Sequence, residues 1–133
     1  MAAAKSVLLA DDYRVQTLML SSRLKARGYR VETAFDATQT FATAIRAKPD
    51  AIVLDIQMPG GTGMIVLERL KASNKTSQIP VIVLSGSTDP EADPTVRRLG
   101  AVGYLSKPVD VDALLGELAR VLGESPPEPT SSE

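Results

Sequence analysis

Polar residues that could act together in metal binding or group transfer follow four short apolar segments of the sequence. Asp11 and Asp12 come directly after the segment VLLA, and Asp55 ends the segment AIVLD. Ser85 ends VIVLS, and Lys107 follows GYLS. Three carboxylates, one hydroxyl and one ammonium therefore lie at the ends of apolar segments, where a buried charge needs a partner.

The apolar segments have the length and composition of β-strands. Five strands are predicted, at Ser6–Ala10, Arg30–Ala34, Ala51–Asp55, Val81–Ser85 and Gly103–Ser106. Helix-like stretches of about ten to fifteen residues separate them, which is the spacing of alternating strands and helices in an α/β protein with a parallel sheet. The segments AIVLD and VIVLS lack polar alternation, which is typical of central strands covered on both faces.

The expected helices have recognisable ends. The first is predicted over residues 14–27, and Gly28 is suited to the left-handed conformation that ends a helix. Asp36, with Gln39 three residues later, matches a capping box and predicts the start of the second helix. The last helix is predicted from about residue 110, with Gly123 ending it.

The carboxyl ends of parallel strands are where doubly wound sheets form their sites, so we expect these polar side chains to converge. Three carboxylates in a partly buried cleft would repel one another unless a cation lies among them. Oxygen ligands alone favour Mg²⁺ or Mn²⁺. A hard cation, an ammonium and a hydroxyl would stabilise a transferred phosphoryl group and leave one carboxylate free to attack phosphorus.

The composition excludes several other chemistries. The chain has 133 residues with neither cysteine nor histidine, which excludes disulfides, zinc-thiolate sites, serine triads and a phosphohistidine on this chain. Its net charge is −1, so direct binding to nucleic acid or to an anionic membrane is not expected. No apolar run approaches the roughly 20 residues that span a bilayer, and no apolar segment of a signal peptide follows Met1–Lys5, so we expect a cytoplasmic protein.

The site residues resemble those of one family, the receiver domains of two-component response regulators. The matching segments are Asp11-Asp12, residues 55–63, which fit D-x-x-M-P-x-x-x-G, Ser85, and the segment YLSKP at residues 104–108. The resemblance covers residues 6 to about 123 and implies a receiver domain over residues 1–123. It also implies a flavodoxin-like, doubly wound (βα)5 fold in three layers, with a parallel sheet of strand order 2-1-3-4-5.

The resemblance assigns a role to each residue of the acid cluster. Asp55 would accept a phosphoryl group from a sensor histidine kinase or a histidine phosphotransfer protein. Mg²⁺, or Mn²⁺, would be held by Asp12, Asp55 and the backbone carbonyl of Gln57, with Asp11 acting mostly through water. The side chains of Gln57 and Ser87 would lie near the path of the water that hydrolyses the phosphorylated form.

The resemblance also implies a switch. Lys107 would pair with Asp55 before phosphorylation and with the phosphoryl oxygens afterwards, Ser85 would donate a hydrogen bond to the phosphoryl group, and Tyr104 would swing inward. The surface of helix four, strand five and helix five would then change and control a downstream protein or an output domain. Lys107-Pro108 is expected to be a cis peptide by the same resemblance.

Two other functions are alternatives to that of a receiver domain, and the residues present count against both. A phosphatase of the haloacid dehalogenase type also uses an aspartyl nucleophile with Mg²⁺, but it would need a second acid at position 57, where this chain has Gln. An interaction module that acts without phosphorylation would not need Asp11, Asp12, Asp55, Ser85 and Lys107, all of which are present.

Two proline-containing segments carry further predictions, one about the start of the fourth helix and one about the C-terminal residues. Pro90 and Pro94 lie where the fourth helix should begin, so that helix is predicted to be short or to begin late, near Asp93 or Pro94. Residues 124–133 contain three prolines and three acids and no large apolar residue, which predicts a disordered terminus or a linker. The sequence leaves open a monomer or a dimer that forms on phosphorylation.

Overall fold

Five parallel strands form one sheet at the centre of the molecule, in the order β2-β1-β3-β4-β5. The computed structural model describes residues 4–57, 63–86 and 94–124. All five strands have the predicted bounds: β1 (Ser6–Ala10), β2 (Arg30–Ala34), β3 (Ala51–Asp55), β4 (Val81–Ser85) and β5 (Gly103–Ser106). The predicted strand order is confirmed.

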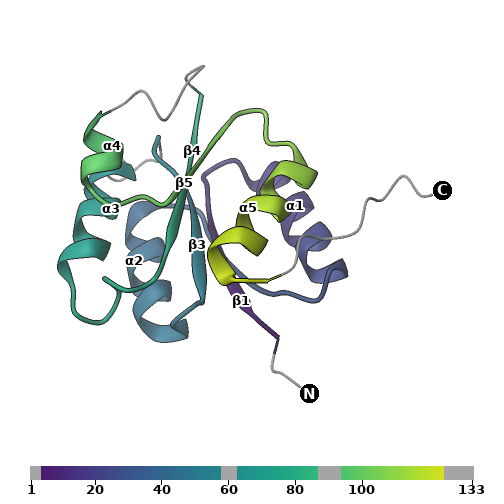
Figure 1. Ribbon diagram of the computed structural model, residues 1–133, viewed down its shortest axis with the longest axis horizontal. Helices are drawn as coiled ribbons and strands as arrows, with labels where there is room; N and C mark the ends of the chain where they lie inside the picture. Colours follow the sequence, from purple (N-terminus) through teal and green to yellow (C-terminus); the bar gives the residue numbers. More distant parts are fainter. Residues whose placement is uncertain (1–3, 58–62, 87–93, 125–133) are drawn as a thin grey trace.

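Helices cover both faces of this sheet and complete a three-layer sandwich (Figure 1). They are α1 (Arg14–Ala26), α2 (Ala37–Ala47), α3 (Gly63–Ala72), α4 (Pro94–Arg98) and α5 (Val111–Leu122). α1 and α5 lie on one face, and α2, α3 and α4 lie on the other. Among the described residues, no helix is long and apolar enough to cross a membrane.

Alternate residues of the central strands face two separate cores. On β3, for example, Ile52 and Leu54 contribute to the core under α2 and α3, whereas Ala51 and Val53 contribute to the core under α1 and α5. Every residue of β3 and β4 is buried. This two-sided burial is the reason that these strands lack polar alternation.

The outer face of α1 is apolar as well as its inner face. Leu20 and Leu24 are buried against the sheet, but Val15, Leu18 and Met19 on the outer side are 69%, 55% and 49% exposed. A helix with apolar residues on both sides has no clear amphipathic pattern. The sequence therefore predicted α1 without indicating which face packs on the sheet.

The ends of α1 and α2 differ slightly from the predictions. α1 ends at Ala26, one residue early, and Gly28 has φ +95°. The amide of Gly28 donates to Lys25 O (3.0 Å), and the next amide donates to Leu24 O (3.1 Å), which together form a Schellman motif. Asp36 caps α2 as predicted, but the side chain of Gln39 accepts from the amide of Phe35 instead of completing the capping box at Asp36.

The two remaining predicted helix boundaries agree with the structure. α5 begins after the N-cap residue Asp110 and ends at Gly123, which has φ +70°. In the described part of the chain, α4 begins at Pro94 and has five residues. Residues 87–93 lie outside the described residues. The described part of α4, Pro94–Arg98, agrees with the predicted short helix that begins near Asp93 or Pro94.

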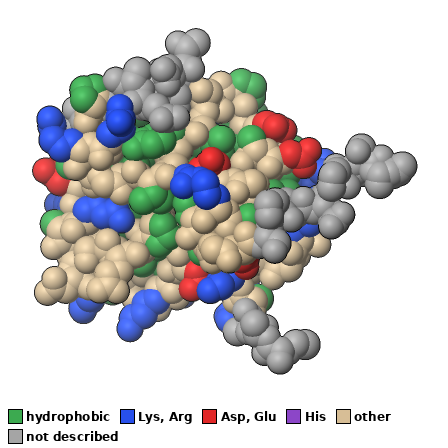
Figure 2. All heavy atoms as spheres, in the orientation of Figure 1, with side chains coloured by type: hydrophobic (Ala, Val, Ile, Leu, Met, Phe, Trp, Pro, Cys, Tyr) green, Lys and Arg blue, Asp and Glu red, His purple; other side chains and the backbone are tan. Residues whose placement is uncertain are grey.

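The surface drawn in Figure 2 carries basic side chains that are spread among acidic and apolar ones. A protein that binds nucleic acid usually gathers its Lys and Arg side chains on one face or along one helix. This view shows no such concentration, which agrees with the net charge of −1.

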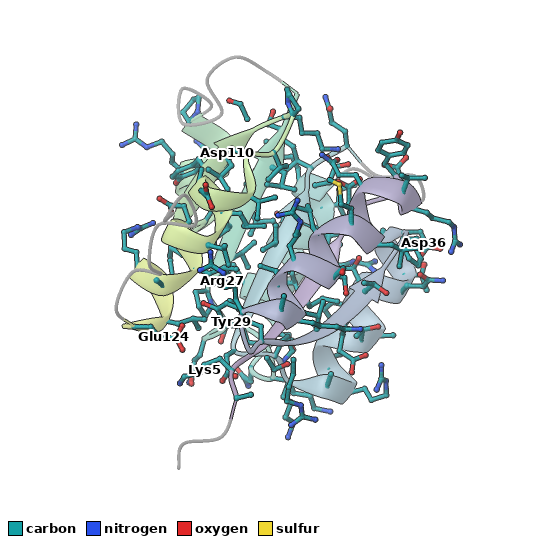
Figure 3. All side chains as sticks on the ribbon, turned by 90° about the vertical axis from the view of Figure 1, so that its right-hand side faces the viewer. Lys5, Arg27, Tyr29, Asp36, Asp110 and Glu124 are labelled. Carbon is teal, nitrogen blue, oxygen red and sulfur yellow. The ribbon has the colours of Figure 1, made fainter. Side chains whose placement is uncertain are left out.

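One hydrogen bond ties the end of α5 to the turn between α1 and β2. The hydroxyl of Tyr29 donates to Glu124 Oε1 at 2.9 Å, and the two residues lie near each other at one end of the molecule (Figure 3). Burial, the hydrogen bond to Glu124 and the negative charge of Glu124 together raise the pKa of Tyr29 to about 12, and burial has the largest effect.

We expect Tyr29 to ionise late in an alkaline titration followed by phenolate absorbance. Tyr29 should ionise near pH 12, and Tyr29→Phe should remove that step alone. Because the folded state holds the Tyr29 proton more tightly than the unfolded state, stability should fall as the pH rises from 10 to 12. If the step that Tyr29→Phe removes lies near pH 10 while circular dichroism shows a folded chain, this expectation is wrong.

Candidate functional site

The register of the sheet brings the predicted site residues to one edge. Ala10 of β1 pairs with Leu54 of β3, so the following residues, Asp11 and Asp55, are neighbours. On the other side of β3, Asp55 pairs with Leu84 of β4, which places Ser85 next to this edge. The convergence predicted from the carboxyl ends of the strands is confirmed.

Three carboxylates form a cluster at this edge. Each of Asp11, Asp12 and Asp55 offers an oxygen atom, and these three oxygens all lie within 4.8 Å of one another. Asp11 and Asp55 are only 3% and 1% exposed, whereas Asp12 is exposed. The cluster is therefore buried on the sheet side and open to solvent at Asp12.

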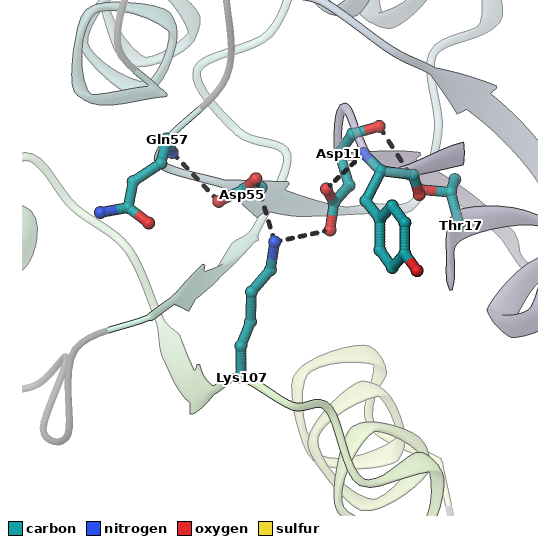
Figure 4. A network of polar contacts seen from close by, with 6 residues as sticks. Asp11, Thr17, Asp55, Gln57 and Lys107 are labelled. Atoms are coloured by element: carbon teal, nitrogen blue, oxygen red, sulfur yellow. Dashed lines mark hydrogen bonds and ion pairs between the residues drawn. The ribbon is translucent and has the colours of Figure 1, made fainter. Parts of the chain in front are cut away.

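Lys107 lies between the two buried carboxylates (Figure 4). Its Nζ atom is 3.1 Å from Asp55 Oδ2 and 3.1 Å from Asp11 Oδ2. The sequence predicted the pair with Asp55, which the structure contains, but not the pair with Asp11. The backbone holds Lys107 in place, since its amide donates to Ser85 O at 2.8 Å and the Lys107-Pro108 peptide is cis, as expected.

Each buried carboxylate uses its other oxygen to fix its own loop. Asp11 Oδ1 accepts from the amide of Tyr13, and Asp55 Oδ1 accepts from the amide of Gln57, both at 3.0 Å. A carboxylate that accepts from the amide two residues later forms a turn that holds the side chain in one orientation. These bonds leave both Oδ2 atoms directed at Lys107.

The electrostatics of the cluster favour an added cation. Burial raises the pKa of Asp55 above its ordinary value and the charge of Asp11 adds to that rise, although the amide of Gln57 and Lys107 oppose it. Burial alone would lower the pKa of Lys107, but the two carboxylates outweigh it and raise that pKa.

Three carboxylates and one ammonium leave two negative charges, which one divalent ion would balance. The donor set consists of oxygen atoms with an opening to solvent, and it suits Mg²⁺, which keeps several of its waters.

Gly63, the last residue of the predicted D-x-x-M-P-x-x-x-G motif, lies against the backbone of the central carboxylate. A Cβ atom at position 63 would overlap the backbone of Ile56 and lie 2.5 Å from the carbonyl oxygen of Asp55. The amide of Gly63 also donates to Ile56 O at 2.8 Å. The glycine is therefore needed for close approach, and not for a positive φ.

The other predicted site residues differ in burial and in the contacts that they make. Ser85 is buried at the end of β4, and the side chain of Gln57 is exposed. Tyr104 is half-buried, and its hydroxyl donates to Ala101 O at 2.9 Å. Ser87 lies outside the described residues. The inward movement of Tyr104 is not tested by a single structure and stays a prediction.

Sequence reasoning missed one residue of this region. Thr17 of α1 is fully buried, and its hydroxyl donates to Tyr13 O at 2.9 Å and lies 3.4 Å from Asp11 O. A threonine in a helix with two apolar faces carries no distinctive pattern. Its proximity to the acid pair becomes visible only when α1 is packed on the sheet.

Comparison with known proteins identifies the family. The model of the response regulator receiver domain matches residues 7–119. The chain therefore belongs to the family of response regulator receiver domains, as the sequence motifs implied. Receiver domains are phosphorylation-activated switches that histidine kinases phosphorylate and that act on output partners, and this chain is such a switch.

Individual relatives support the same conclusion. The chain is 36% identical to Protein PilH of Pseudomonas aeruginosa over 117 residues, which cover 87% of this chain and 96% of PilH. The structure of the chemotaxis response regulator CheY4 of Vibrio cholerae superposes with a TM-score of 0.82 at 34% identity, covering 90% of this chain and 99% of CheY4.

A third relative bears on the metal. The receiver domain of the sensor histidine kinase PA1611 of Pseudomonas aeruginosa, at 27% identity and a TM-score of 0.82, covers 92% of this chain and 100% of that domain. Its structure contains a magnesium ion coordinated in the active site cleft. This chain has a cluster of three Asp side chains with suitable geometry for a metal ion.

The share of each relative that the chain covers differs widely. It spans nearly all of PilH, but between 25% and 64% of seven other curated proteins that it matches. Receiver domains thus occur both almost alone and within longer proteins. None of these comparisons supports the haloacid dehalogenase alternative.

Proposed function

We propose that Asp55 is the phosphoacceptor of this receiver domain and that Mg²⁺ assists the transfer. The observation that supports this most directly is the buried Asp55 carboxylate, with Oδ2 at 3.1 Å from Lys107 Nζ inside a cluster of three carboxylates. Asp12, Asp55 and the backbone carbonyl of Gln57 would hold the ion, with Asp11 acting mostly through water. Mn²⁺ would fit the same oxygen ligands.

In the proposed reaction, a carboxylate oxygen of Asp55 attacks the phosphorus of a phosphohistidine. A new O–P bond forms, the P–N bond breaks, and its electron pair returns to the imidazole of the donor. Because this chain contains no histidine, that imidazole lies outside these 133 residues. The bound cation would neutralise charge on the phosphoryl oxygens.

Lys107 has two roles in this reaction. Before transfer, its ammonium favours the ionised form of Asp55 and so opposes the effect of burial, and a carboxylate must be ionised to act as the nucleophile. After transfer, the same ammonium can move to the phosphoryl oxygens while Asp11 still balances part of its charge. The pair with Asp11 thus keeps Lys107 at the site when Asp55 is modified.

The switch would start from the phosphoryl group. It adds about 1.5 to 2 negative charges and new acceptor oxygens at Asp55. The hydroxyl of Ser85 would donate to them, and Tyr104 would give up its bond to Ala101 O and swing inward. The surface formed by α4, β5 and α5 would change as a result. Gln57 and Ser87 would affect how fast water removes the phosphoryl group.

The proposed partners follow from this chemistry. The donor would be a sensor histidine kinase or a histidine phosphotransfer protein in the cytoplasm, and the output would be a downstream protein or a further domain. We propose residues 1–123 as the receiver domain and residues 124–133 as a disordered terminus or linker. Both a monomer and a dimer formed on phosphorylation are compatible with this proposal.

The proposal predicts a phosphoryl adduct that depends on the metal. Incubation with Mg²⁺ and a small acyl phosphate should add one phosphoryl group to the intact mass, because such a donor needs no protein contact. The same incubation with excess chelator should leave the mass unchanged. An unmodified mass together with absent Mg²⁺ binding would instead favour a module that acts without phosphorylation.

A further inference from the structure

The loop that carries the acid pair is held at each end by contacts from outside it. At its start, the amide of Asp11 donates to Ala34 O of β2 at 3.1 Å. At its end, the carbonyl of Tyr13 accepts from the hydroxyl of Thr17 at 2.9 Å and from the amide of Thr17 at 3.0 Å. The Thr17 hydroxyl also lies 3.4 Å from Asp11 O, so it approaches the carbonyls on both sides of Asp12 (Figure 4).

Asp12 itself has no such support from its side chain. Within the described residues, its carboxylate makes no hydrogen bond or ion pair, and it is exposed. The position of this carboxylate therefore depends on the backbone at Asp11 and Tyr13. The residue of α1 that contacts both of those carbonyls is Thr17, which is 0% exposed.

We infer that Thr17 is a positioning residue that holds Asp12 in place for the cation. The inference rests on the proposed Mg²⁺ site, since it concerns the geometry of one ligand of that site. Removing the hydroxyl would leave the carbonyls of Asp11 and Tyr13 without this donor and allow the loop to shift. Replacing a residue that orients a metal ligand without binding the metal itself commonly changes metal affinity about tenfold or more.

The chain contains a matched comparison for this hydroxyl. Thr40 of α2 is also 0% exposed, and its hydroxyl donates to the carbonyl four residues earlier, Asp36 O, at 2.8 Å. Both threonines therefore have the same local bond and the same burial. They differ in location, because Asp36 is not part of the acid cluster.

The test compares Mg²⁺ affinity in Thr17→Val, Thr17→Ser and Thr40→Val by titration calorimetry, with stability measured separately by urea unfolding. Valine keeps the shape of threonine without the hydroxyl, so both valine variants should lose similar stability. Only Thr17→Val should weaken Mg²⁺ binding, by about tenfold. Thr17→Ser retains the hydroxyl and should bind Mg²⁺ like the original chain.

The possible outcomes separate this inference from the proposed function. Equal Mg²⁺ affinity in Thr17→Val and Thr40→Val would overturn the role of Thr17 while leaving the metal site intact. Weakened affinity in Thr17→Ser would also overturn it, because packing of the methyl group and not the hydroxyl would then be responsible, and this comparison stands even where Thr17→Val fails to fold. An original chain that binds no Mg²⁺ would overturn both proposals.

Discussion

Asp55→Asn is expected to abolish the phosphoryl adduct while leaving the domain folded. Asn has the shape of Asp, so it fits the buried position at the end of β3, but its neutral amide is not a nucleophile for phosphorus. Intact mass after incubation with Mg²⁺ and a small acyl phosphate should show the adduct in the original chain and none in the variant. Asp112→Asn, an exposed position on α5, is the matched control and should be labelled normally.

The stability of Asp55→Asn separates a lost nucleophile from a lost fold. Burial raises the pKa of Asp55 above the ordinary 3.8, so the folded state disfavours the charged form more than the unfolded state does. Stability therefore falls as the pH rises from 3.8 through the raised pKa, and the full cost is present above that pKa. The side chain of Asn is uncharged, so Asp55→Asn removes the cost of burying a charged carboxylate at this position.

In chelator at pH 7, the urea midpoint of Asp55→Asn should therefore be no lower than that of the original chain. A lower midpoint would mean that the pair with Lys107 outweighs burial and the repulsion from Asp11. Undiminished labelling of the variant would show that another residue is the acceptor.

Gly63→Ala is expected to destabilise the domain by about 3 kcal/mol, because the added methyl group would overlap backbone atoms that have no room to move. The overlap is with Ile56 and with the carbonyl of Asp55, so the end of β3 or the start of α3 would have to shift. Urea unfolding followed by circular dichroism measures the change. The same shift would move the Asp55 carboxylate, so labelling should also slow.

Gly116→Ala provides the control for helix propensity. Gly116 lies inside α5, and a Cβ atom there would have nothing within 4 Å. Because alanine favours the helix, this variant should gain about 0.5 to 1 kcal/mol. Similar changes in both variants would show that position 63 tolerates a methyl group and that its glycine is not required for close approach.

Much of the architecture was predictable because the chain's local patterns agree with one another. Strands that are covered on both faces, such as AIVLD, can be recognised from their length and from their unbroken run of apolar residues. Asp36 and Gly123 mark helix ends because capping depends on neighbouring residues alone. The acid pair, Asp55 and Lys107 were identifiable because each directly follows or ends such a strand.

Other features depend on contacts between distant segments. The inner face of α1 was undetermined in the sequence, because Val15, Leu18 and Met19 are as apolar as the residues that are buried. Packing against β2, β1 and α5 decides the rotation of this helix and, with it, the burial of Thr17.

The sequence by itself determined the order of the elements, the family and the identity of the acidic and basic residues at the site. The order of the elements follows from periodicity, and the family follows from the resemblance of the site motifs to those of known receiver domains. Only the tertiary structure decided that Lys107 is shared between Asp11 and Asp55 and that Thr17 contacts the acid-pair loop. Such contacts are set by the register of β1, β3, β4 and β5 and by how α1 packs on them, and no local pattern encodes those distances.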